Sequence, residues 1–217
     1  DGTYAIEADR YNAYLGPAYS DEEVLSVVKK LNLNYHVDEC IEESASTLLA
    51  EGKIIGWFQG RMEMGPRALG ARSILANPSD KNTLDYINNE IKYREEWRPL
   101  SPSILTEFSS EYVYNPFESK NMLFAFKAKD IMLNNMSAAV HVDGTTRIQT
   151  VSKDNSRYRT LIEKFYEKTG VPGVLNTSFN LDGEPIVCSP VDAIRTFYSS
   201  NLDSLILGNI LINKNRG

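Results

Sequence analysis

The chain has 217 residues, 42% hydrophobic and 24% charged, which is the composition of an ordinary globular protein with room for one large domain or two small ones. The net charge of -6 argues against a general nucleic-acid binder, because such proteins gain affinity by neutralising phosphates with a positive surface. No apolar run approaches the roughly 18 residues that span a bilayer, and Cys40 and Cys188 form no metal-ligand spacing. We expect a cytoplasmic protein with reduced thiols.

Residues 1–17 lack a clear hydrophobic period, so we interpret them as a connector from a preceding domain. Ser20 and Glu23 form a capping box, which predicts a helix to about Leu31. The first half of the chain then predicts, in order, a helix at 40–50, a buried strand at 53–58, a strand at 72–76, a helix at 81–92 and a strand at 100–105.

The second half mixes both element types without strict alternation. It predicts strands at 122–128, 138–142 and 147–151, a helix at 155–168, a strand at 174–180, a helix from Ser189 to Tyr198, and β-rich sequence at 205–212 broken at Gly208. Asp143-Gly144 is typical of a hairpin turn, and Gly170 is typical of a helix end. We therefore expect a single α/β domain, of α+β type with a mixed sheet.

The densest cluster of backbone-permissive and cationic residues is at 60–73, which we call the arginine/glycine loop. It follows a predicted strand and contains three glycines and three arginines against one glutamate. Glycine lets backbone N–H groups approach a ligand, and arginine presents a planar fork of donors that matches phosphate or carboxylate. The loop predicts an anion site, although any one of its arginines could equally be a solvated surface residue.

Three further polar clusters lie at predicted strand ends or turns, at 92–99, 141–147 and 176–185. Lys92 and Arg94 close a predicted helix, where cations are favourable even without a ligand. Arg98 has two acidic neighbours that could be its salt-bridge partners. These residues fit an anion site, and they also fit ordinary structural roles.

His141 is one of only two histidines, so a transition-metal centre built by this chain alone is not expected. Asp143 could bind Mg²⁺ held by a nucleotide, but Asp-Gly is also a favoured turn. Ser178 has no neighbouring base that would make it a nucleophile. We interpret Ser178 and Asn180 as neutral phosphate ligands, with turn formation as the alternative.

Four runs in this order, GRMEMGPRALGARSIL, KYREEWRPLSPS, HVDGTTRIQTV and TGVPGVLNTSFNLDGEPIV, resemble the C-terminal domain of the NodU/CmcH family of O-carbamoyltransferases. The resemblance covers the chain from about Leu15 onward. It implies a YrdC-like fold for residues 18–217, with the KxR signature at residues 92–94 and the SxN signature at residues 178–180. It also implies that residues 1–17 connect to a preceding Kae1-like domain, which would carry an iron site.

The family resemblance implies a two-step chemistry. A YrdC-like domain makes carbamoyl adenylate from carbamoyl phosphate and ATP with Mg²⁺, and the Kae1-like domain passes the carbamoyl group to an acceptor hydroxyl. The present chain would bind and adenylate but would not complete the transfer alone. The acceptor and the oligomeric state, a homodimer included, stay open.

Two phosphorylated substrates repel each other, so holding them together requires cations that keep their charge at neutral pH. The resemblance implies a nucleotide site made by Lys92, Arg94, Arg147, Ser178 and Asn180. From the charge of the arginine/glycine loop we add the hypothesis that Arg61, Arg67, Arg72 and Ser73 hold carbamoyl phosphate, or the phosphate that leaves it, with Arg98 and Arg147 as further clamps. The residues expected nearest the reacting group are Arg67, Arg98, His141 and Asp143, and no protein metal ligand is expected.

Two other functions fit the same residues. A threonylcarbamoyl-adenylate synthase would use the same fold with bicarbonate and threonine in place of carbamoyl phosphate. A non-catalytic module could bind a nucleotide or RNA through an arginine-rich cleft, although the acidic balance argues against RNA.

Overall fold

A computed structural model of the protein describes residues 12–214. Most of the expected connector, residues 1–11, therefore lies outside the described residues. The described part contains an eight-stranded sheet with the order β1 (His36–Val37), β10 (Ile210–Asn213), β9 (Ser204–Leu207), β2 (Ile55–Phe58), β3 (Arg72–Ala76), β8 (Gly173–Ser178), β4 (Ser101–Leu105) and β7 (Gln149–Val151). The pairs β2–β9 and β4–β7 are parallel and the others are antiparallel, which confirms the mixed sheet in a single domain.

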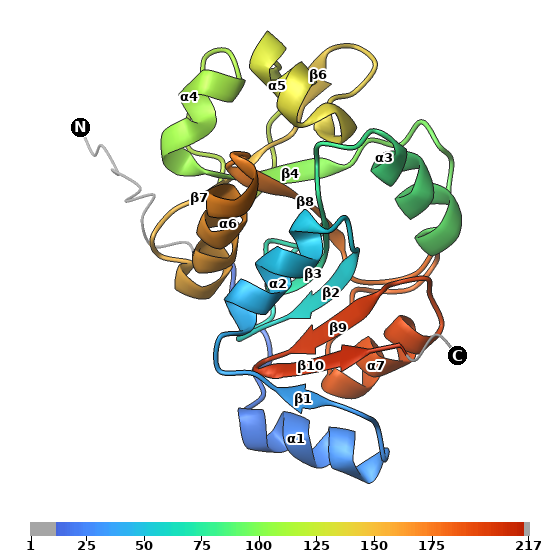
Figure 1. Ribbon diagram of the computed structural model, residues 1–217. Helices are drawn as coiled ribbons and strands as arrows, with labels where there is room; N and C mark the ends of the chain where they lie inside the picture. Colours follow the sequence, from blue (N-terminus) through green and yellow to red (C-terminus); the bar gives the residue numbers. More distant parts are fainter. Residues whose placement is uncertain (1–11, 215–217) are drawn as a thin grey trace, which may run out of the picture.

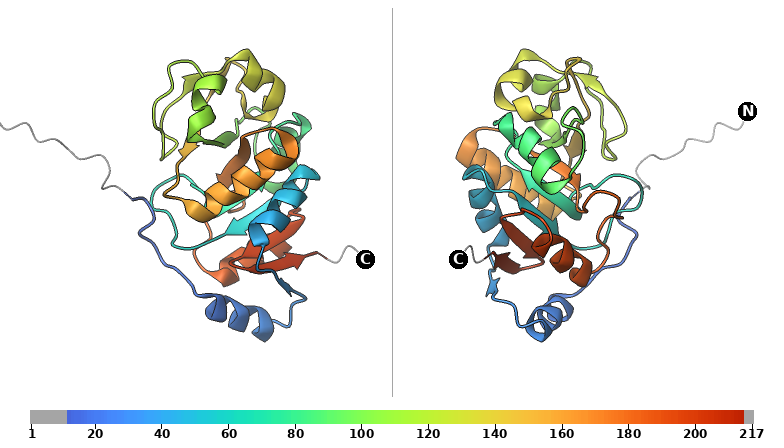
Figure 2. Two further views of the ribbon diagram at one scale, coloured as in Figure 1. Left: turned by 60° about the vertical axis from the view of Figure 1, so that its left-hand side comes forward. Right: turned by 90° about the vertical axis from the view of Figure 1, so that its right-hand side faces the viewer.

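Helices cover both faces of this sheet. On one face α2 (Ile41–Ala50) packs against α6 (Ser156–Thr169), and on the other α7 (Pro190–Tyr198) packs on β9 and β2 (Figures 1 and 2). Helix α1 (Asp21–Lys30) contacts α7 at the end of the molecule that carries β1. Strands β2, β3, β4 and β9 are buried along their whole length, because helices or loops cover them on both sides.

The opposite end of the molecule carries a small cap beside β4 and β7 (Figure 1). It consists of α4 (Ser109–Tyr112), α5 (Asp130–Asn135) and the two-stranded sheet of β5 (Phe126–Lys127) with β6 (Thr145–Thr146). A short α3 (Asn82–Tyr86) continues into one π-helical turn at Ile87–Ile91. Every helix within residues 12–214 is too short or too polar to cross a lipid bilayer.

The helix-end signals are confirmed by the structure. The Ser20 side chain accepts from the Glu23 backbone while the Glu23 side chain accepts in return, and Ser189 and Asp192 form the same reciprocal pair at α7. Gly170 ends α6 with a φ of 72°, a left-handed conformation that glycine adopts without strain. These signals lie within a few residues of the helix end, so they survive in the fold.

One predicted strand is wrong and another is only partly confirmed. Residues 138–142 form part of a 3₁₀ turn (Ser137–Ala139) and an irregular stretch, in which the Ala138 backbone donates to the Pro78 carbonyl. Of residues 122–128 only Phe126–Lys127 form a strand, because Met122 has a φ of 54° that no strand accepts. Short apolar runs show that a segment is buried but do not fix its backbone conformation.

Strand register brings the end of the 60–73 cluster and the start of the 176–185 cluster together with the start of β4, which follows the 92–99 cluster, at one edge of the sheet. Arg72 is paired with the last residue of β2, and the next residue, Ser73, is paired with Ser178 at the end of β8. Ser101 at the start of β4 is paired with Asn176 of β8. The arginine/glycine loop, the end of β8 and the start of β4 therefore meet in space, although they are far apart in the chain.

Candidate functional site

A cleft of about 80 Å³ lies at this edge, and we call it the arginine cleft. Its lining contains three arginines and no carboxylate, so the cleft is locally positive on an acidic protein. The lining residues are Pro66, Arg67, Ala68, Arg94, Pro99, Leu100, Ser101, Met122, Arg147, Asn176, Thr177 and Ser178.

Arg67 and Arg147 bring unpaired donors to the cleft. The Nε atom of each is buried and has no hydrogen-bond partner among the described residues. One Nη atom of Arg147 donates to the Ser101 hydroxyl at 3.1 Å. Burial, and to a lesser degree the nearby Arg67, lower the pKa of Arg147. Two guanidinium groups that repel each other, each with a buried Nε that lacks a partner, are stabilised when an anion accepts from them.

Arg94 is held in place by the segment that carries it. Its Nε donates to the side-chain oxygen of Asn88 at 2.8 Å, and the buried Asn88 amide donates to the Glu96 and Arg98 carbonyls. Tyr93, between the two cations of the KxR signature, has a φ of 48°, which is uncommon for a residue with a side chain. The turn makes Lys92 a buried residue while Arg94 lines the cleft.

Lys92 faces the SxN signature and does not line the arginine cleft. Its ammonium is 3.3 Å from the Ser178 hydroxyl and donates to the Ser178 carbonyl, and it donates to the carbonyl and side-chain oxygens of Asn180 at 2.9 and 2.7 Å. Burial, followed by the charge of Arg94, lowers the pKa of Lys92 to about 7, while Asp182 opposes this shift. The four oxygens occupy the donors of Lys92, so the structure favours a supporting role.

The SxN signature is itself a closed hydrogen-bonded turn. The Ser178 hydroxyl donates to the side-chain oxygen of Asn180 at 2.6 Å, and the Asn180 amide donates to the Glu184 carbonyl at 2.6 Å. Ser178 lines the arginine cleft and Asn180 does not. Ser178 is therefore the residue of this turn that a cleft ligand would contact, and Asn180 holds its orientation.

Glu63 organises the arginine/glycine loop. It is buried, and one carboxylate oxygen accepts from the backbone N–H groups of Leu69, Ala71 and Arg72, at 2.5, 3.2 and 3.3 Å. The loop is also paired with the described part of the expected connector. The Gly16 backbone donates to the Met62 carbonyl at 2.9 Å, the Met62 backbone to Pro17 at 2.9 Å and the Met64 backbone to Ala13 at 2.7 Å.

Arg72 and Ser73 are fully buried in this loop. The Arg72 guanidinium lies 3.5 Å above the Phe58 ring centroid, and burial lowers its pKa to about 10. Its terminal nitrogens donate to the carbonyls of Gln59, Ala71, Pro17 and Gly60. The Ser73 hydroxyl accepts from the Gly70 backbone at 3.0 Å. These contacts favour a supporting role, and direct substrate binding by either residue stays a prediction.

Four other predicted site residues do not line the arginine cleft. Arg61 donates to the Gly16 carbonyl at 3.1 Å, and Arg98 forms an exposed ion pair with Glu95 at 2.9 Å. His141 is 3.1 Å from Asp143, which also accepts from the Thr145 hydroxyl and backbone in an exposed turn. The Thr145 contacts, more than His141, lower the pKa of Asp143 to about 2. Catalytic roles for Arg98, His141 and Asp143 stay predictions.

The sequence placed Asn176 in a polar cluster but did not indicate the hydrogen-bonded role of the neutral residues beneath the arginine cleft. The buried Asn176 amide donates to the Ala68 carbonyl, the Ser103 hydroxyl and the Gln149 side chain, at 3.1, 3.0 and 3.1 Å. The Gln149 amide in turn donates to the Leu69 carbonyl at 2.9 Å. This network fixes the tip of the arginine/glycine loop on β8, β4 and β7. Only the alternation of polar residues along these strands could have indicated it.

The donor set suits a phosphate better than a metal ion. Arginine, serine and asparagine side chains offer N–H and O–H donors, whereas Mg²⁺ requires oxygen ligands and keeps several waters. Because no carboxylate lines the arginine cleft, Mg²⁺ fits there only as part of a complex with a nucleotide. Among residues 12–214, no three His, Cys, Asp or Glu side chains come together as a metal site would require.

Comparison with solved structures identifies the fold of the chain. The Sua5 protein of P. abyssi, solved with L-threonine, matches 84% of this chain and half of its own at a TM-score of 0.58 and 16% identity. E. coli YciO matches 80% of this chain and 81% of its own at a TM-score of 0.54 and 17% identity. The chain therefore has the YrdC/Sua5-like α/β fold.

Sequence comparison gives the family. Residues 46–214 match the model of the carbamoyltransferase C-terminus, and the chain belongs to this family. Nodulation protein NolO of Bradyrhizobium diazoefficiens is 42% identical over 94% of this chain, which covers 38% of NolO. The 3'-hydroxymethylcephem-O-carbamoyltransferase of Amycolatopsis lactamdurans is 34% identical over 77% of this chain, which covers 32% of that enzyme. The chain thus spans roughly a third of the length of these relatives.

Proposed function

We propose that this chain is the adenylating part of an O-carbamoyltransferase. It binds carbamoyl phosphate and ATP with Mg²⁺ and forms carbamoyl adenylate. A Kae1-like domain elsewhere in the full-length protein then transfers the carbamoyl group to an acceptor hydroxyl. The longer relatives support a larger parent protein, since the chain covers only 38% of NolO.

The observation that carries the proposal is the pair of buried, unpartnered guanidinium nitrogens of Arg67 and Arg147 at a cleft without carboxylates. Leaving buried donors unpaired costs about 1–3 kcal/mol each, and an anion offsets this cost by accepting from them. Arg94 and Ser178 supply further donors to the same cleft. Such a cluster suits phosphate groups, because guanidinium keeps its charge at neutral pH.

The chemistry balances when one water takes part. Water cleaves carbamoyl phosphate into carbamate and phosphate, and a carbamate oxygen then attacks the α-phosphorus of ATP while pyrophosphate leaves. The residues of the arginine cleft hold the reacting groups together and offset the negative charge that develops on the phosphate oxygens. No covalent bond to the protein is required.

The structural neighbours support phosphate and nucleotide binding by this fold. Full-length HypF, solved in a phosphate- and nucleotide-bound form, matches 79% of this chain and 25% of its own at a TM-score of 0.56 and 18% identity. The named carbamoyltransferase among the relatives supports the carbamoyl group as the group transferred. The Sua5 complex with L-threonine favours a second candidate, a threonylcarbamoyl-adenylate synthase.

Pyrophosphate release tests the proposal. The chain should release pyrophosphate from ATP when carbamoyl phosphate is added, and Arg94→Ala should reduce the rate at least tenfold. Lys81→Ala is the control, because Lys81 is an exposed cation just before α3 that does not line the cleft. Release that depends on bicarbonate with threonine would select the synthase instead. Calorimetry that detects binding of neither ATP nor carbamoyl phosphate would contradict both candidates.

A further inference from the structure

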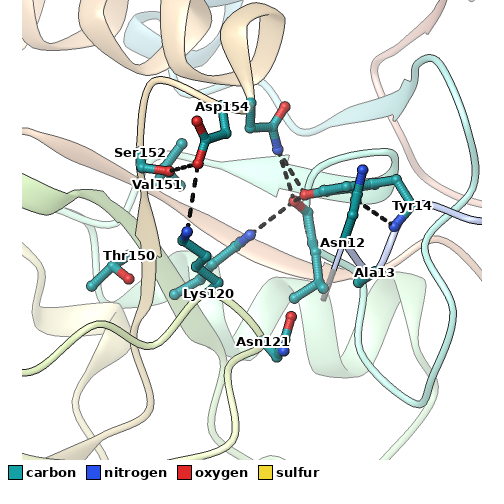
Figure 3. A pocket seen from close by; sticks show the side chains of 12 residues that line it. Asn12, Ala13, Tyr14, Lys120, Asn121, Thr150, Val151, Ser152 and Asp154 are labelled. Atoms are coloured by element: carbon teal, nitrogen blue, oxygen red, sulfur yellow. Dashed lines mark hydrogen bonds and ion pairs between the residues drawn. The ribbon is translucent and has the colours of Figure 1, made fainter. Parts of the chain in front are cut away.

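A second hollow lies beside the arginine cleft, and the site described above does not use it. It has a volume of about 250 Å³, and we call it the amide pocket (Figure 3). Four side-chain amides line it, from Asn12, Asn121, Gln149 and Asn155, together with the Tyr14 ring. The remaining lining residues are Ala13, Leu69, Lys120, Thr150, Val151, Ser152 and Asp154.

The amide pocket is electrically balanced, unlike the arginine cleft. The ammonium of Lys120, its one cationic lining residue, lies 3.5 Å from Asp154 and 3.3 Å from Glu118. No arginine lines the pocket. A phosphate therefore gains little there, whereas a neutral ligand meets amide donors and acceptors, apolar walls and an aromatic ring.

Some of these amides have free hydrogen-bonding capacity. The Asn121 side chain is exposed and makes no hydrogen bond among the described residues. Asn12 uses only its side-chain oxygen, which accepts from the Tyr14 backbone at 2.9 Å. The Asn155 amide donates to the Tyr14 hydroxyl at 2.7 Å, which leaves its oxygen free to accept. The pocket thus offers both donors and acceptors to a ligand.

The two hollows adjoin at two pairs of neighbouring residues and across one side-chain hydrogen bond. Ala68 lines the arginine cleft and the next residue, Leu69, lines the amide pocket. Likewise, Met122 lines the cleft and Asn121 lines the pocket. Asn176 at the cleft donates to the Gln149 side chain at the pocket, at 3.1 Å. One extended molecule with an anionic end and a neutral, planar, hydrogen-bonding end matches both hollows, and a nucleotide has this composition.

We propose that the amide pocket binds the nucleoside part of ATP while the triphosphate lies in the arginine cleft. This inference rests on the proposed function, because it takes ATP as the nucleotide. It assigns the base and ribose to residues outside the KxR and SxN signatures. Among these residues, Asn12 and Asn121, which are far apart in the chain, supply side-chain NH2 groups that make no hydrogen bond within the described residues.

Substitutions that fill the pocket distinguish binding of the nucleoside from binding of the phosphates. Asn121→Trp places a large ring at an exposed position whose side chain makes no hydrogen bond among the described residues. Independently, Asn12→Trp places one at an exposed position and removes a single hydrogen bond, the one from the Tyr14 backbone. By calorimetry, each variant should bind ATP at least tenfold more weakly than the unmodified chain, yet bind inorganic tripolyphosphate and carbamoyl phosphate within twofold. Asn134→Trp, at an exposed position of α5 that does not line either hollow, is the matched control and should bind ATP normally.

Each outcome has a defined meaning. Unchanged ATP affinity in both filled variants, or an unmodified chain that binds ATP no more tightly than tripolyphosphate, overturns the amide pocket as the nucleoside site and leaves the proposed function standing. An unmodified chain that binds neither ATP nor carbamoyl phosphate overturns the proposed function itself. If the filled variants lose affinity for ATP and for tripolyphosphate equally, the inference is also overturned, because the substitutions would then act on phosphate binding.

Discussion

Three guanidinium groups line the arginine cleft, and they differ in their hydrogen-bond partners within the protein. Arg94 is fixed by Asn88, Arg147 donates to Ser101, and Arg67 has a buried nitrogen without a partner. Arg67 is therefore the residue whose charge is least satisfied by the protein itself. A bound anion should gain most from Arg67, because its side chain gives up no existing contact to meet the ligand.

Replacing Arg67 by alanine should lower the affinity for carbamoyl phosphate at least tenfold while the fold stays intact. The physical reason is that alanine removes one of the three arginines of the cleft, and with it a charge-assisted donor. Calorimetry measures the affinity, and circular dichroism checks the fold. Arg195→Ala, which removes an exposed arginine of α7 outside the cleft, should leave the affinity unchanged. Equal behaviour of the two variants would remove Arg67 from the site.

Lys92 supports the SxN signature without lining the arginine cleft, and its burial makes its protonation depend on folding. Its pKa of about 7 in the folded protein lies below the ordinary value of 10.5, so the unfolded chain binds the proton more strongly between these two values. The contribution of Lys92 to stability therefore rises with pH from about 7 to 10.5, and it stays at its lowest below pH 7.

Comparison with Lys92→Met measures this effect. The free energy of unfolding of the unmodified chain, relative to the variant, should rise with pH by up to about 1.4 kcal/mol per pH unit between pH 7 and 10. Denaturant unfolding at several pH values gives the difference. A difference that does not change with pH would mean that the oxygens around Lys92 keep the ammonium charged throughout this range.

At the scale of the elements, the arginine/glycine loop owes its shape to one buried carboxylate. Glu63 gathers three backbone N–H groups that follow Arg67 in the chain, and the loop tip is fixed from below by Asn176 and Gln149. Gly70 has a φ of 102°, and a Cβ there would lie 2.2 Å from the Tyr158 ring. The loop is therefore a rigid support for the cleft.

Replacing Glu63 by glutamine should destabilise the protein by about 1–3 kcal/mol, because an uncharged amide accepts less strongly and adds donors that lack partners. The affinity for carbamoyl phosphate should fall as well, since the loop that carries Arg67 loosens. Thermal unfolding and calorimetry measure the two effects. Glu51→Gln, at an exposed position after α2, should change neither. A stable Glu63→Gln variant with normal affinity would show that the carboxylate does not organise the loop.

The sequence predicted the parts of the fold that depend on neighbouring residues. The capping boxes at Ser20 and Ser189 were confirmed because both partners lie within one helical turn. The strand at 138–142 was wrong, because that backbone conformation depends on a contact with Pro78. Apolar composition alone could not reveal such a distant partner.

The same limit applies to the candidate site. Motifs indicated Arg67, Arg94, Arg147 and Ser178, which line one cleft. They also grouped Arg72 with the anion ligands, although its contacts to the carbonyls of residues 17 and 59 exist only in the folded chain. Residue types predicted the chemistry of the cleft, and strand register decided which residues reach it.

At the scale of the molecule, a locally positive cleft lies on a protein of net charge -6. Small anions can enter such a cleft, whereas a long polyanion also meets the rest of a protein whose net charge is negative. This contrast separates the proposed enzyme from an RNA-binding module. It also explains why several arginines can coexist with an acidic composition.

The chain should bind ATP saturably at ordinary salt and should not bind RNA under the same conditions. Fluorescence anisotropy with a labelled single-stranded RNA and with a labelled ATP analogue measures both. Arg147→Ala should reduce only the ATP signal. Tight RNA binding with a steep dependence on salt concentration would favour the binding module and count against the enzyme.

The backbone pairing between residues 13–17 and Met62 and Met64 has a practical meaning for how this unit is delimited. The sequence suggested a domain that starts at residue 18. A protein cut there would lose the backbone hydrogen bonds that residues 13–17 make with the loop that carries Arg67. A change in the conformation of residues 13–17 should therefore also shift this loop and the cleft that it lines.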